Sequence, residues 1–325
     1  MATGIGFIGL GIMGNRMMTN MTAHGGFHLV CAWDPGEPAC EKAKADFAGL
    51  EIAASARAVI DNPDVHIVYI ASPPASHREY AMAAAEAGKA VFCEKPLGID
   101  VAESREMVRR FEQLGTKNAV NYPLANSIAA DTLKAAIDAG DLGEITGANI
   151  SLHFAPWPRD WQADATWLKQ RAEGGFIREV GSHWIYLSER LFGQADVINS
   201  VVLFPDDDVS CESHVQAQLV CEDIPVSLTA TSGGIGPDVV QFTVWGTKTS
   251  YRINMWVDLF RADGETWQPV HPDIDDAREV SYLRGLDNLL AWYKDEPHSI
   301  ASFADALSVQ EAVESILSGG EDDED

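Results

Sequence analysis

A glycine motif close to the N-terminus constrains the fold of this chain more than any other feature. Residues 9–14 have the spacing G-x-G-x-x-G, directly after the apolar run Ile5–Ile8 and before a helical pattern at 15–24. In this context the first glycine permits a tight turn, the second lets a pyrophosphate approach the backbone, and the third lets helix and strand pack closely. The helix N-terminus then offers free amides to a phosphate. The residues expected to hold this cofactor are Gly9, Gly11, Ile12, Met13 and Gly14.

The first 120 residues repeat an alternation of apolar strand and helix. The expected strands lie at 5–8, 28–33, 65–71, 90–93 and 117–120. The expected helices lie at 15–24, 38–48, 76–87 and 102–114. Near-continuous apolar strands separated by helices are typical of a parallel sheet that is covered on both faces. The sequence therefore predicts a doubly wound α/β domain with right-handed crossovers.

The pattern changes near residue 145. Apolar and polar side chains alternate with a period of two at 145–154, 196–204, 213–221, 225–232, 239–246 and 250–257. This alternation predicts an antiparallel sheet with one solvated or ligand-facing side. Two helical segments follow, at 281–294 and 301–317. Because 325 residues suffice for two domains, we expect a dinucleotide-binding domain at 1–121 and a substrate-binding domain at 122–325.

The net charge of the chain is strongly negative. It is −26, from 49 acidic and 23 basic residues, so nucleic acids and anionic membrane surfaces are not expected partners. No stretch reaches the ~20 apolar residues of a membrane span. The N-terminus begins a strand and lacks the basic region of a secretory signal. The acidic end at 319–325 is expected to be disordered.

Cysteine usage indicates a reducing compartment. The cysteines are odd in number, scattered, and never in a CxxC pair: Cys31, Cys40, Cys93, Cys211 and Cys221. This pattern fits reduced thiols better than a disulfide framework or a structural zinc site. We therefore expect a cytoplasmic protein, and we predict no metal ligands.

An acidic residue at the end of the second expected strand indicates which dinucleotide binds. Asp34 lies 20 residues after Gly14, where a carboxylate accepts hydrogen bonds from the adenosine ribose. The 2′-phosphate of NADP would be repelled there, and no arginine occurs in the sequence WDPGEPACEK around it. We expect NAD rather than NADP.

A charged pair and a proline, Glu94-Lys95-Pro96, end the fourth expected strand. Charged residues are rarely buried unless they are paired or used. This strand ends at the same carboxyl edge as the first, where open α/β sheets bind ligands. Lys95 would then lie near the nicotinamide and stabilise negative charge on a substrate oxygen. Glu94 would hydrogen-bond the cofactor or hold Lys95. Pro96 would aim the loop, for which a cis bond is one means.

A second informative stretch is GGFIREVGSHWIYLSERLFG at 174–193. Its apolar residues from Val180 to Leu191 recur at helical spacing and predict a core face. A polar ridge follows the same steps one residue earlier. The ridge consists of Glu179, His183, Tyr186 and Arg190. An imidazole suits general acid–base chemistry there, since its ordinary pKa of about 6.5 lies near neutral pH.

Taken together, these stretches resemble the Gfo/Idh/MocA family, which is related to glucose–fructose oxidoreductase and inositol dehydrogenase. The resemblance rests on CEKPL at 93–97, on ASPPASHREYAMAAAEAGKAVF before it, on the glycine motif, and on DALSVQEAVESILSGG at 305–320. It implies a Rossmann domain followed by an α+β domain with a large, mostly antiparallel open sheet. It also implies NAD(P)-linked oxidoreductase chemistry on sugars and cyclitols, and a homodimer or homotetramer packed through that sheet.

The resemblance implies roles for residues in the first domain. Ser72 and Pro73 match the family's loop along the cofactor, and His77 matches a histidine that follows this loop. A helix-start histidine without a ligand contact is the alternative for His77. Asn121 and Tyr122 follow the fifth expected strand, where family members place groups that face the substrate.

In the second domain the family pattern is D-x-G-x-H-x-x-D. Glu179, Gly181 and His183 match its acidic residue, glycine and histidine, and the histidine is assigned as the general acid/base. Tyr186 stands where the last aspartate is expected and is not an anionic acceptor, so the substrate is left open. The implied chemistry is hydride transfer between a carbinol carbon and nicotinamide, and either Lys95 or His183 could be the base.

The loop at 154–171 and the residue at 178 supply further candidates for the substrate pocket. These are Trp157, Arg159, Trp161 and Arg178. Indoles stack on sugar C–H surfaces and arginine favours a carboxylate, although packing in a core or an interface also explains the tryptophans. An uncharged sugar, a cyclitol, a sugar acid and a small aromatic-derived diol all remain possible substrates.

Four rival functions remain. The glycine motif also resembles the β-hydroxyacid dehydrogenases, whose second domain is helical, but the alternating strands at 196–257 argue against them. A relative of the same fold could cleave glycosides with NAD. A reductase or dehydrogenase of a dihydrodiol or small ketone is the third alternative. The fourth is a non-catalytic nucleotide-binding protein, which the presence of both Lys95 and His183 disfavours.

Overall fold

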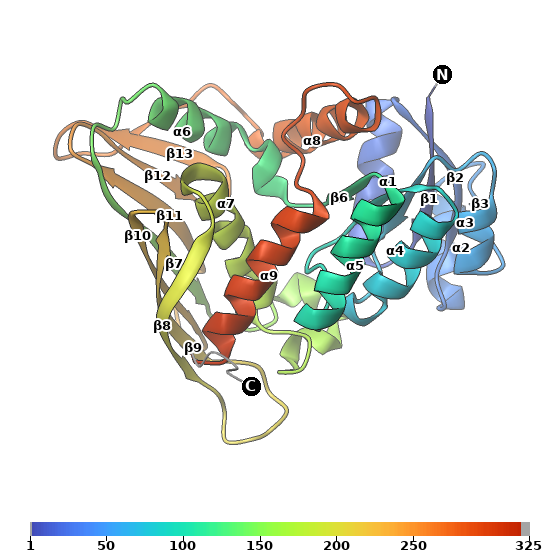
Figure 1. Ribbon diagram of the computed structural model, residues 1–325, viewed down its shortest axis with the longest axis horizontal. Helices are drawn as coiled ribbons and strands as arrows, with labels where there is room; N and C mark the ends of the chain where they lie inside the picture. Colours follow the sequence, from blue (N-terminus) through green and yellow to red (C-terminus); the bar gives the residue numbers. More distant parts are fainter. Residues whose placement is uncertain (1, 320–325) are drawn as a thin grey trace. The chain divides into compact units, whose positions relative to one another are not determined.

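The computed structural model describes residues 2–319 of the chain (Figure 1). Within these residues the chain forms two compact units, one of 2–122 with 282–307 and the other of 123–281 with 308–319. The sequence analysis placed 282–307 in the second domain, whereas their contacts group them with the first unit. The tail expected to be disordered lies outside the described residues, apart from Gly319.

The first unit is built on a six-stranded parallel sheet with the order β3-β2-β1-β4-β5-β6. Its strands are β1 (Thr3–Ile8), β2 (Phe27–Trp33), β3 (Glu51–Ile52), β4 (Ile67–Ile70), β5 (Ala90–Cys93) and β6 (Asn118–Val120). Every residue of β1, β4 and β5 is buried, so both faces of the sheet are covered. The predicted doubly wound sheet is thereby confirmed. The strand order reverses between β1 and β4, the position at which such sheets bind ligands.

Helices alternate with the strands of this unit, in colours from blue to blue-green in Figure 1; all of them except α3 were predicted. They are α1 (Ile12–His24), α2 (Glu37–Asp46), α3 (Ala56–Asp61), α4 (His77–Glu86) after the 3₁₀ turn η1 (Pro74–Ser76), and α5 (Val101–Leu114). α5 begins where the Asp100 carboxylate accepts a 2.7 Å hydrogen bond from the Glu103 amide, and it ends at Gly115 in a left-handed conformation. A core of methionines on α1 and apolar residues of β1 packs one face of the sheet.

The second unit is built on an eight-stranded sheet with the order β14-β13-β12-β11-β7-β10-β9-β8. Its strands are β7 (Ile145–Phe154), β8 (Ala195–Leu203), β9 (His214–Cys221), β10 (Ile224–Ser232), β11 (Val239–Gly246), β12 (Ser250–Asn254), β13 (Asp258–Ala262) and β14 (Gln268–Pro269). Neighbouring strands are antiparallel except β7 and β10, which are parallel. Buried and exposed residues alternate along β9 and β10, so the predicted open, mostly antiparallel sheet is confirmed.

Helices pack on the buried face of this sheet. They are α6 (Ile128–Asp138), α7 (Ser182–Phe192) and the π-helical turn η5 (Ile177–Gly181) directly before α7. Trp184 of α7 stacks on Phe242 of β11, with ring centroids 5.9 Å apart and planes at 19°. Short 3₁₀ turns lie at η2 (Pro123–Asn126), η3 (Asp160–Gln162) and η4 (Thr166–Lys169). The last helices are α8 (Ala277–Tyr293) and α9 (Phe303–Leu317).

Two general features of the described residues bear on function. No helix within 2–319 is both long enough and apolar enough to cross a membrane. The five cysteines all lie in the described part of the chain, where each is buried and unpaired.

Candidate functional site

The carboxyl ends of the parallel strands in the first unit lie in one row. The last residues of five strands are aligned as neighbours across the sheet: Trp33, Ile8, Ile70, Cys93 and Val120. The residues that follow them therefore lie along the same edge of the sheet. These residues are Asp34, Gly9, Ala71, Glu94 and Asn121. Strand register thus brings four of the predicted site residues to one edge, and only Ala71 was not among the predictions.

The three glycines of the motif differ in their surroundings. Gly9 has a φ of 99°, and a Cβ there would lie 2.5 Å from the carbonyl carbon of Ala71. A Cβ at Gly14 would lie 2.2 Å from the Gly9 carbonyl oxygen. At Gly11, in contrast, a Cβ would meet no other described atom within 4 Å.

Gly11 is also the N-cap of α1. Within the described residues no side chain caps this helix, and its first turn carries no acidic residue. The amides of this turn therefore bond to no described side chain and lie at the positive end of the helix dipole. A dinucleotide pyrophosphate fits this arrangement of residues.

Asp34 supports the same turn. Its Oδ2 accepts a 2.8 Å hydrogen bond from the Leu10 amide, and its Oδ1 accepts a 2.7 Å bond from the Gly36 amide. The carboxylate thereby joins the end of β2 to the loop between β1 and α1. Each carboxylate oxygen has a second lone pair, so hydrogen bonds from ribose hydroxyls remain available.

Glu94 is a buried carboxylate, only 6% exposed. Its Oε1 accepts hydrogen bonds from the Tyr69 hydroxyl and, at 2.7 Å, from the Asn121 side-chain amide. Burial, together with the charge of Glu94, raises the pKa of Tyr69 well above its ordinary value, so the phenol remains a donor. The sequence analysis missed Tyr69. The available signal was a tyrosine inside an apolar strand, because a buried phenol usually has a hydrogen-bond partner.

Lys95 follows this buried cluster and is partly exposed. The Lys95–Pro96 peptide bond is cis, the arrangement named as one means of aiming the loop. Asn121 was predicted to face a substrate, and its side-chain amide donates a hydrogen bond to Glu94. Tyr122, predicted with it, is 2% exposed.

His77 joins two loops at the edge of the sheet. It is 1% exposed, with Nδ1 2.8 Å from the Pro96 carbonyl oxygen and Nε2 2.8 Å from the Ser72 carbonyl oxygen. Burial lowers the pKa of this imidazole, so the neutral ring donates to one of the two carbonyls. The Ser72 hydroxyl accepts a 2.7 Å bond from Ser76, and Pro73 is exposed. His77 therefore holds the predicted cofactor loop at Ser72 and Pro73 against the loop that contains Pro96.

In the second unit, Glu179 and His183 lie on one continuous helical segment made of η5 and α7. Glu179 accepts a 2.9 Å hydrogen bond from Gln162, whose Oε1 accepts a 2.8 Å bond from the Arg159 Nε. The Arg159 guanidinium lies 4.8 Å from the centre of the Trp161 ring. Gln162 thus connects Glu179 with Arg159, and Arg159 in turn contacts Trp161. A glutamine inside a polar loop gave no sequence signal for this role.

His183 and Tyr186 are each 6% exposed on α7. The His183 ring meets Trp256 edge to face, with centroids 5.2 Å apart and planes at 83°. Trp256 was not predicted as a site residue. Arg190, the last member of the ridge, instead bonds Asp131 of α6 at 2.6 Å and thereby anchors α7.

Arg178 has partners within its own unit. Its guanidinium forms two hydrogen bonds to Glu314, at 2.7 and 2.6 Å, and its Nη1 also donates to the carbonyl oxygens of Arg171 and Gly174. Nearby, Glu212 accepts a 2.8 Å bond from the Ile177 amide at the start of η5. These contacts occupy the donors that would have bound a substrate carboxylate.

The two tryptophans predicted for the substrate pocket differ in their surroundings. Trp157 donates its indole N–H to the Leu168 carbonyl oxygen at 3.0 Å and packs against Phe154 and Phe176. Trp161 is 49% exposed. Trp157 therefore packs within the unit, whereas Trp161 is about half exposed and has the Arg159 guanidinium over its ring.

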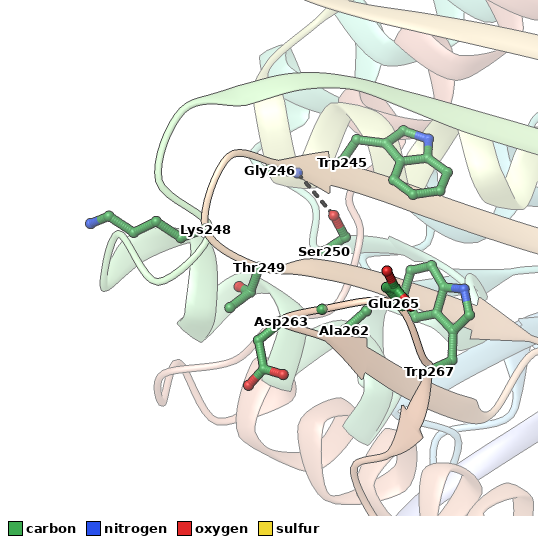
Figure 2. A pocket seen from close by; sticks show the side chains of 10 residues that line it. Trp245, Gly246, Lys248, Thr249, Ser250, Ala262, Asp263, Glu265 and Trp267 are labelled. Carbon is green, nitrogen blue, oxygen red and sulfur yellow. Dashed lines mark hydrogen bonds between the residues drawn. The ribbon is translucent and has the colours of Figure 1, made fainter.

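A cavity of about 360 Å³ lies at the edge of the second unit's sheet, between the β11–β12 turn and the β13–β14 turn (Figure 2). Trp245 and Trp267 meet there with ring centroids 5.9 Å apart, and Arg252 covers Trp267. None of the predicted site residues lines this cavity. Because it lacks them, we do not assign the reaction to this cavity.

A parallel sheet in this strand order is typical of dinucleotide-binding proteins when a glycine turn and an uncapped helix N-terminus lie where the strand order reverses. Residues 3–122 match the family model described as "Oxidoreductase family, NAD-binding Rossmann fold", and residues 130–252 match the GFO/IDH/MocA C-terminal domain. The two matches together cover most of the chain. The chain belongs to the GFO/IDH/MocA oxidoreductase family, as the resemblance indicated.

Curated relatives share part of the sequence. Levoglucosan dehydrogenase of Pseudarthrobacter phenanthrenivorans is 32% identical over 148 residues, which are 45% of this chain and 38% of the relative. Inositol 2-dehydrogenase of Pseudomonas syringae is 36% identical over 153 residues, 44% of each chain. The matched region thus spans less than half the length of these relatives.

Solved structures share the fold over nearly the whole chain. A levoglucosan dehydrogenase in complex with NADH and levoglucosan has a TM-score of 0.84 at 23% identity, over 98% of this chain and 97% of that one. A putative NADPH-dependent oxidoreductase from Desulfitobacterium hafniense has the same TM-score at 19% identity, over 98% and 95%. At these identities the likeness establishes the fold.

Proposed function

We propose that this protein is an NAD-dependent oxidoreductase that transfers a hydride between nicotinamide and a carbinol or carbonyl carbon of a sugar, a cyclitol or a related small polyol. The observation that carries the proposal is the single row at the carboxyl edge, where Gly9, Asp34 and Glu94 follow aligned strand ends. The names of the relatives, levoglucosan and inositol dehydrogenases, support the substrate class.

The cofactor would be held by residues of the first unit. The glycine turn and the first turn of α1 would bind its pyrophosphate, and Asp34 would bind its ribose. The carboxylate at position 34 favours NAD over NADP because a 2′-phosphate would meet like charge. When bound, the nicotinamide supplies the acceptor or donor of the hydride.

The chain's own residues supply the proton and the charge stabilisation. His183 takes or gives the proton of the substrate hydroxyl. Lys95 donates a hydrogen bond to the same oxygen and stabilises the negative charge that develops on it. Glu94, held by Tyr69 and Asn121, precedes Lys95 and fixes the start of its loop.

The substrate would be recognised in the second unit. Glu179 accepts hydrogen bonds from substrate hydroxyls, Tyr186 donates one, and Trp161 stacks on the C–H face of the ring. Arg159 orients Glu179 through Gln162. We leave Arg178 out of the proposed pocket because its guanidinium is bonded to Glu314.

At the level of domains, residues 1–121 would bind the dinucleotide, and residues 122–325 would bind the substrate and assemble the oligomer. The open face of the second sheet would form a homodimer or homotetramer interface, since Ile198, Val201 and Leu203 on β8 are each more than half exposed. The unpaired cysteines support a cytoplasmic location.

A panel of sugars, sugar acids, cyclitols and small diols tests the function. Wild-type protein is mixed with NAD or NADH and each compound, and NADH absorbance is followed in both directions. We expect turnover with at least one polyol, with NAD preferred over NADP. Glycoside cleavage without net NADH change would indicate the hydrolase alternative instead, and binding of NADH with no turnover of any compound would contradict the proposal.

A further inference from the structure

The turn between β12 and β13 has an unusual backbone. Met255 and Trp256 are adjacent, and their φ angles are 44° and 79°. The two strands pair up to Asn254 and Asp258, and the turn is closed by a 3.2 Å hydrogen bond from the Val257 amide to the Asn254 carbonyl oxygen. Turns with two positive φ angles normally use asparagine, aspartate or glycine. Two bulky residues in this conformation are strained.

The strained turn places the Trp256 indole against α7. Its ring contacts His183 edge to face at 5.2 Å and Trp184 at 5.4 Å. Trp184 is fully buried and is itself stacked on Phe242 of β11. The indole is therefore wedged between the proposed proton-transfer residue and a rigid aromatic stack. Edge-to-face contact is a preferred geometry for aromatic pairs, so the imidazole orientation is coupled to that of the indole.

Core packing alone does not account for this arrangement. Trp256 is partly exposed, and its neighbour Met255 is 43% exposed. A hairpin of ordinary turn residues would close the same two strands without strain. Backbone strain of this kind persists where the surroundings hold it, and it gathers at functional sites.

We propose that Trp256 is a positioning residue for His183, held by the strained Met255–Trp256 turn so that its indole fixes the orientation of the imidazole and covers one of its sides. The inference rests on the proposed function in one respect, namely that His183 exchanges the proton. A misplaced catalytic group slows the reaction without weakening substrate binding to the same degree.

The experiment uses Trp256→Leu and Trp256→Phe in the full-length protein, with Trp245→Leu as the matched control. Trp245 lies on β11 of the same sheet and contacts Trp267 instead of His183. Two readouts are followed. One is the pair of His183 ring C–H signals in NMR spectra, assigned with His183→Gln. The other is kcat and KM with the active polyol from the panel.

Trp256→Leu is expected to move both His183 ring signals and to lower kcat by about tenfold or more, with a smaller change in KM. Trp256→Phe, which keeps a smaller ring at the same place, is expected to move the signals less and to restore most of kcat. Trp245→Leu should leave the His183 signals and kcat unchanged. Unmoved His183 signals in both Trp256 variants would overturn the proposal.

The two variants also separate this inference from the proposed function. If the leucine variant does not fold, the phenylalanine variant alone gives the reading, and unmoved signals in it overturn the inference. If the wild-type protein turns over no polyol, the proposed function fails. The NMR comparison, which needs no turnover, still decides whether Trp256 orients His183.

Discussion

Two buried glutamates hold loops in this protein, and their surroundings differ. Glu94 receives hydrogen bonds from two neutral side chains, Tyr69 and Asn121. Glu212 is 2% exposed and receives the Ile177 amide, with Arg178, Glu314 and Cys211 as its charged or titratable neighbours. Burial raises the pKa of Glu212 to about 7 despite the Ile177 and Arg178 contacts. Glu212 therefore supports the start of η5 at an electrostatic cost.

Removing the donor to Glu94 should destabilise the first unit. In Tyr69→Phe the ring shape is kept, but the buried carboxylate loses the hydrogen bond from the phenol. We expect a loss of about 1–3 kcal/mol in the free energy of unfolding, measured with urea. Tyr251→Phe is the control, because Tyr251 is buried and its hydroxyl bonds to no other side chain among residues 2–319. Equal stabilities of Tyr69→Phe and Tyr251→Phe would refute the role given to the Tyr69 hydroxyl.

The raised pKa of Glu212 makes stability depend on pH. The folded state holds this proton up to a pKa of about 7, whereas the glutamate of the unfolded chain releases it near its ordinary pKa of 4.5. The stability that Glu212 contributes is therefore complete below pH 4.5 and is lost as the pH rises through 7. In Glu212→Gln this loss is absent. Relative to wild type, the free energy of unfolding of the variant is therefore expected to rise by about 3 kcal/mol when the pH is raised from 4.5 to 8.

Denaturant unfolding across this pH range measures the difference between the two proteins. Glu79→Gln is the control, since Glu79 is an exposed glutamate. A difference between Glu212→Gln and wild type that stays constant with pH would show that Glu212 titrates at an ordinary pKa.

At the scale of elements, the sequence predicts those parts whose signals are local. The strand–turn–helix around the glycine motif and the strand at 145–154 follow directly from periodicity, and β7 has the predicted bounds. Five α-helices and strands were not predicted, namely α6, β13, β14 and the short pair β3 and α3. β3 has two residues and α3 has six, too few to establish a period.

The site shows the same division between local and distant signals. Strand ends at a carboxyl edge can be predicted because parallel register is a property of the fold. Gln162 could not be predicted, because its partner Glu179 lies 17 residues further along the chain. Trp256 could not be predicted either, because its partner His183 belongs to a different element. Arg178 was predicted to bind the substrate because its partner could not be recognised from the sequence. That partner, Glu314, lies 136 residues further along the chain.

The N-terminus of α1 allows binding and folding to be separated. Gly11→Asp puts a carboxylate where the phosphate would bind, at a position where a Cβ meets no other described atom within 4 Å. We expect NADH affinity to fall by about a hundredfold or more, while thermal stability is kept. Gly9→Ala is expected to lower thermal stability, because its Cβ would clash with the Ala71 backbone at a φ of 99°. NADH titration and thermal unfolding distinguish the two effects. Tight NADH binding by Gly11→Asp would contradict the proposal that the pyrophosphate binds at the N-terminus of α1.

At the scale of the whole molecule, net charge and the open sheet act in opposite directions. Copies that each carry −26 repel one another, whereas the exposed apolar residues of β8 favour association. We expect Leu203→Glu to dissociate the proposed oligomer, and added salt to strengthen the wild-type assembly by screening the repulsion. Light scattering after size exclusion gives the mass in each condition. A wild-type monomer at every salt concentration would contradict the assembly.

The most direct test of the central claim follows the transferred hydrogen itself. The polyol that the panel identifies is deuterated at its carbinol carbon, and the label on NADH is measured by mass spectrometry for wild type, Lys95→Met and His183→Ala. We expect deuterated NADH from wild type and at least about a hundredfold slower labelling in both variants, with NADH affinity retained. Near-wild-type labelling in both variants would contradict the central claim.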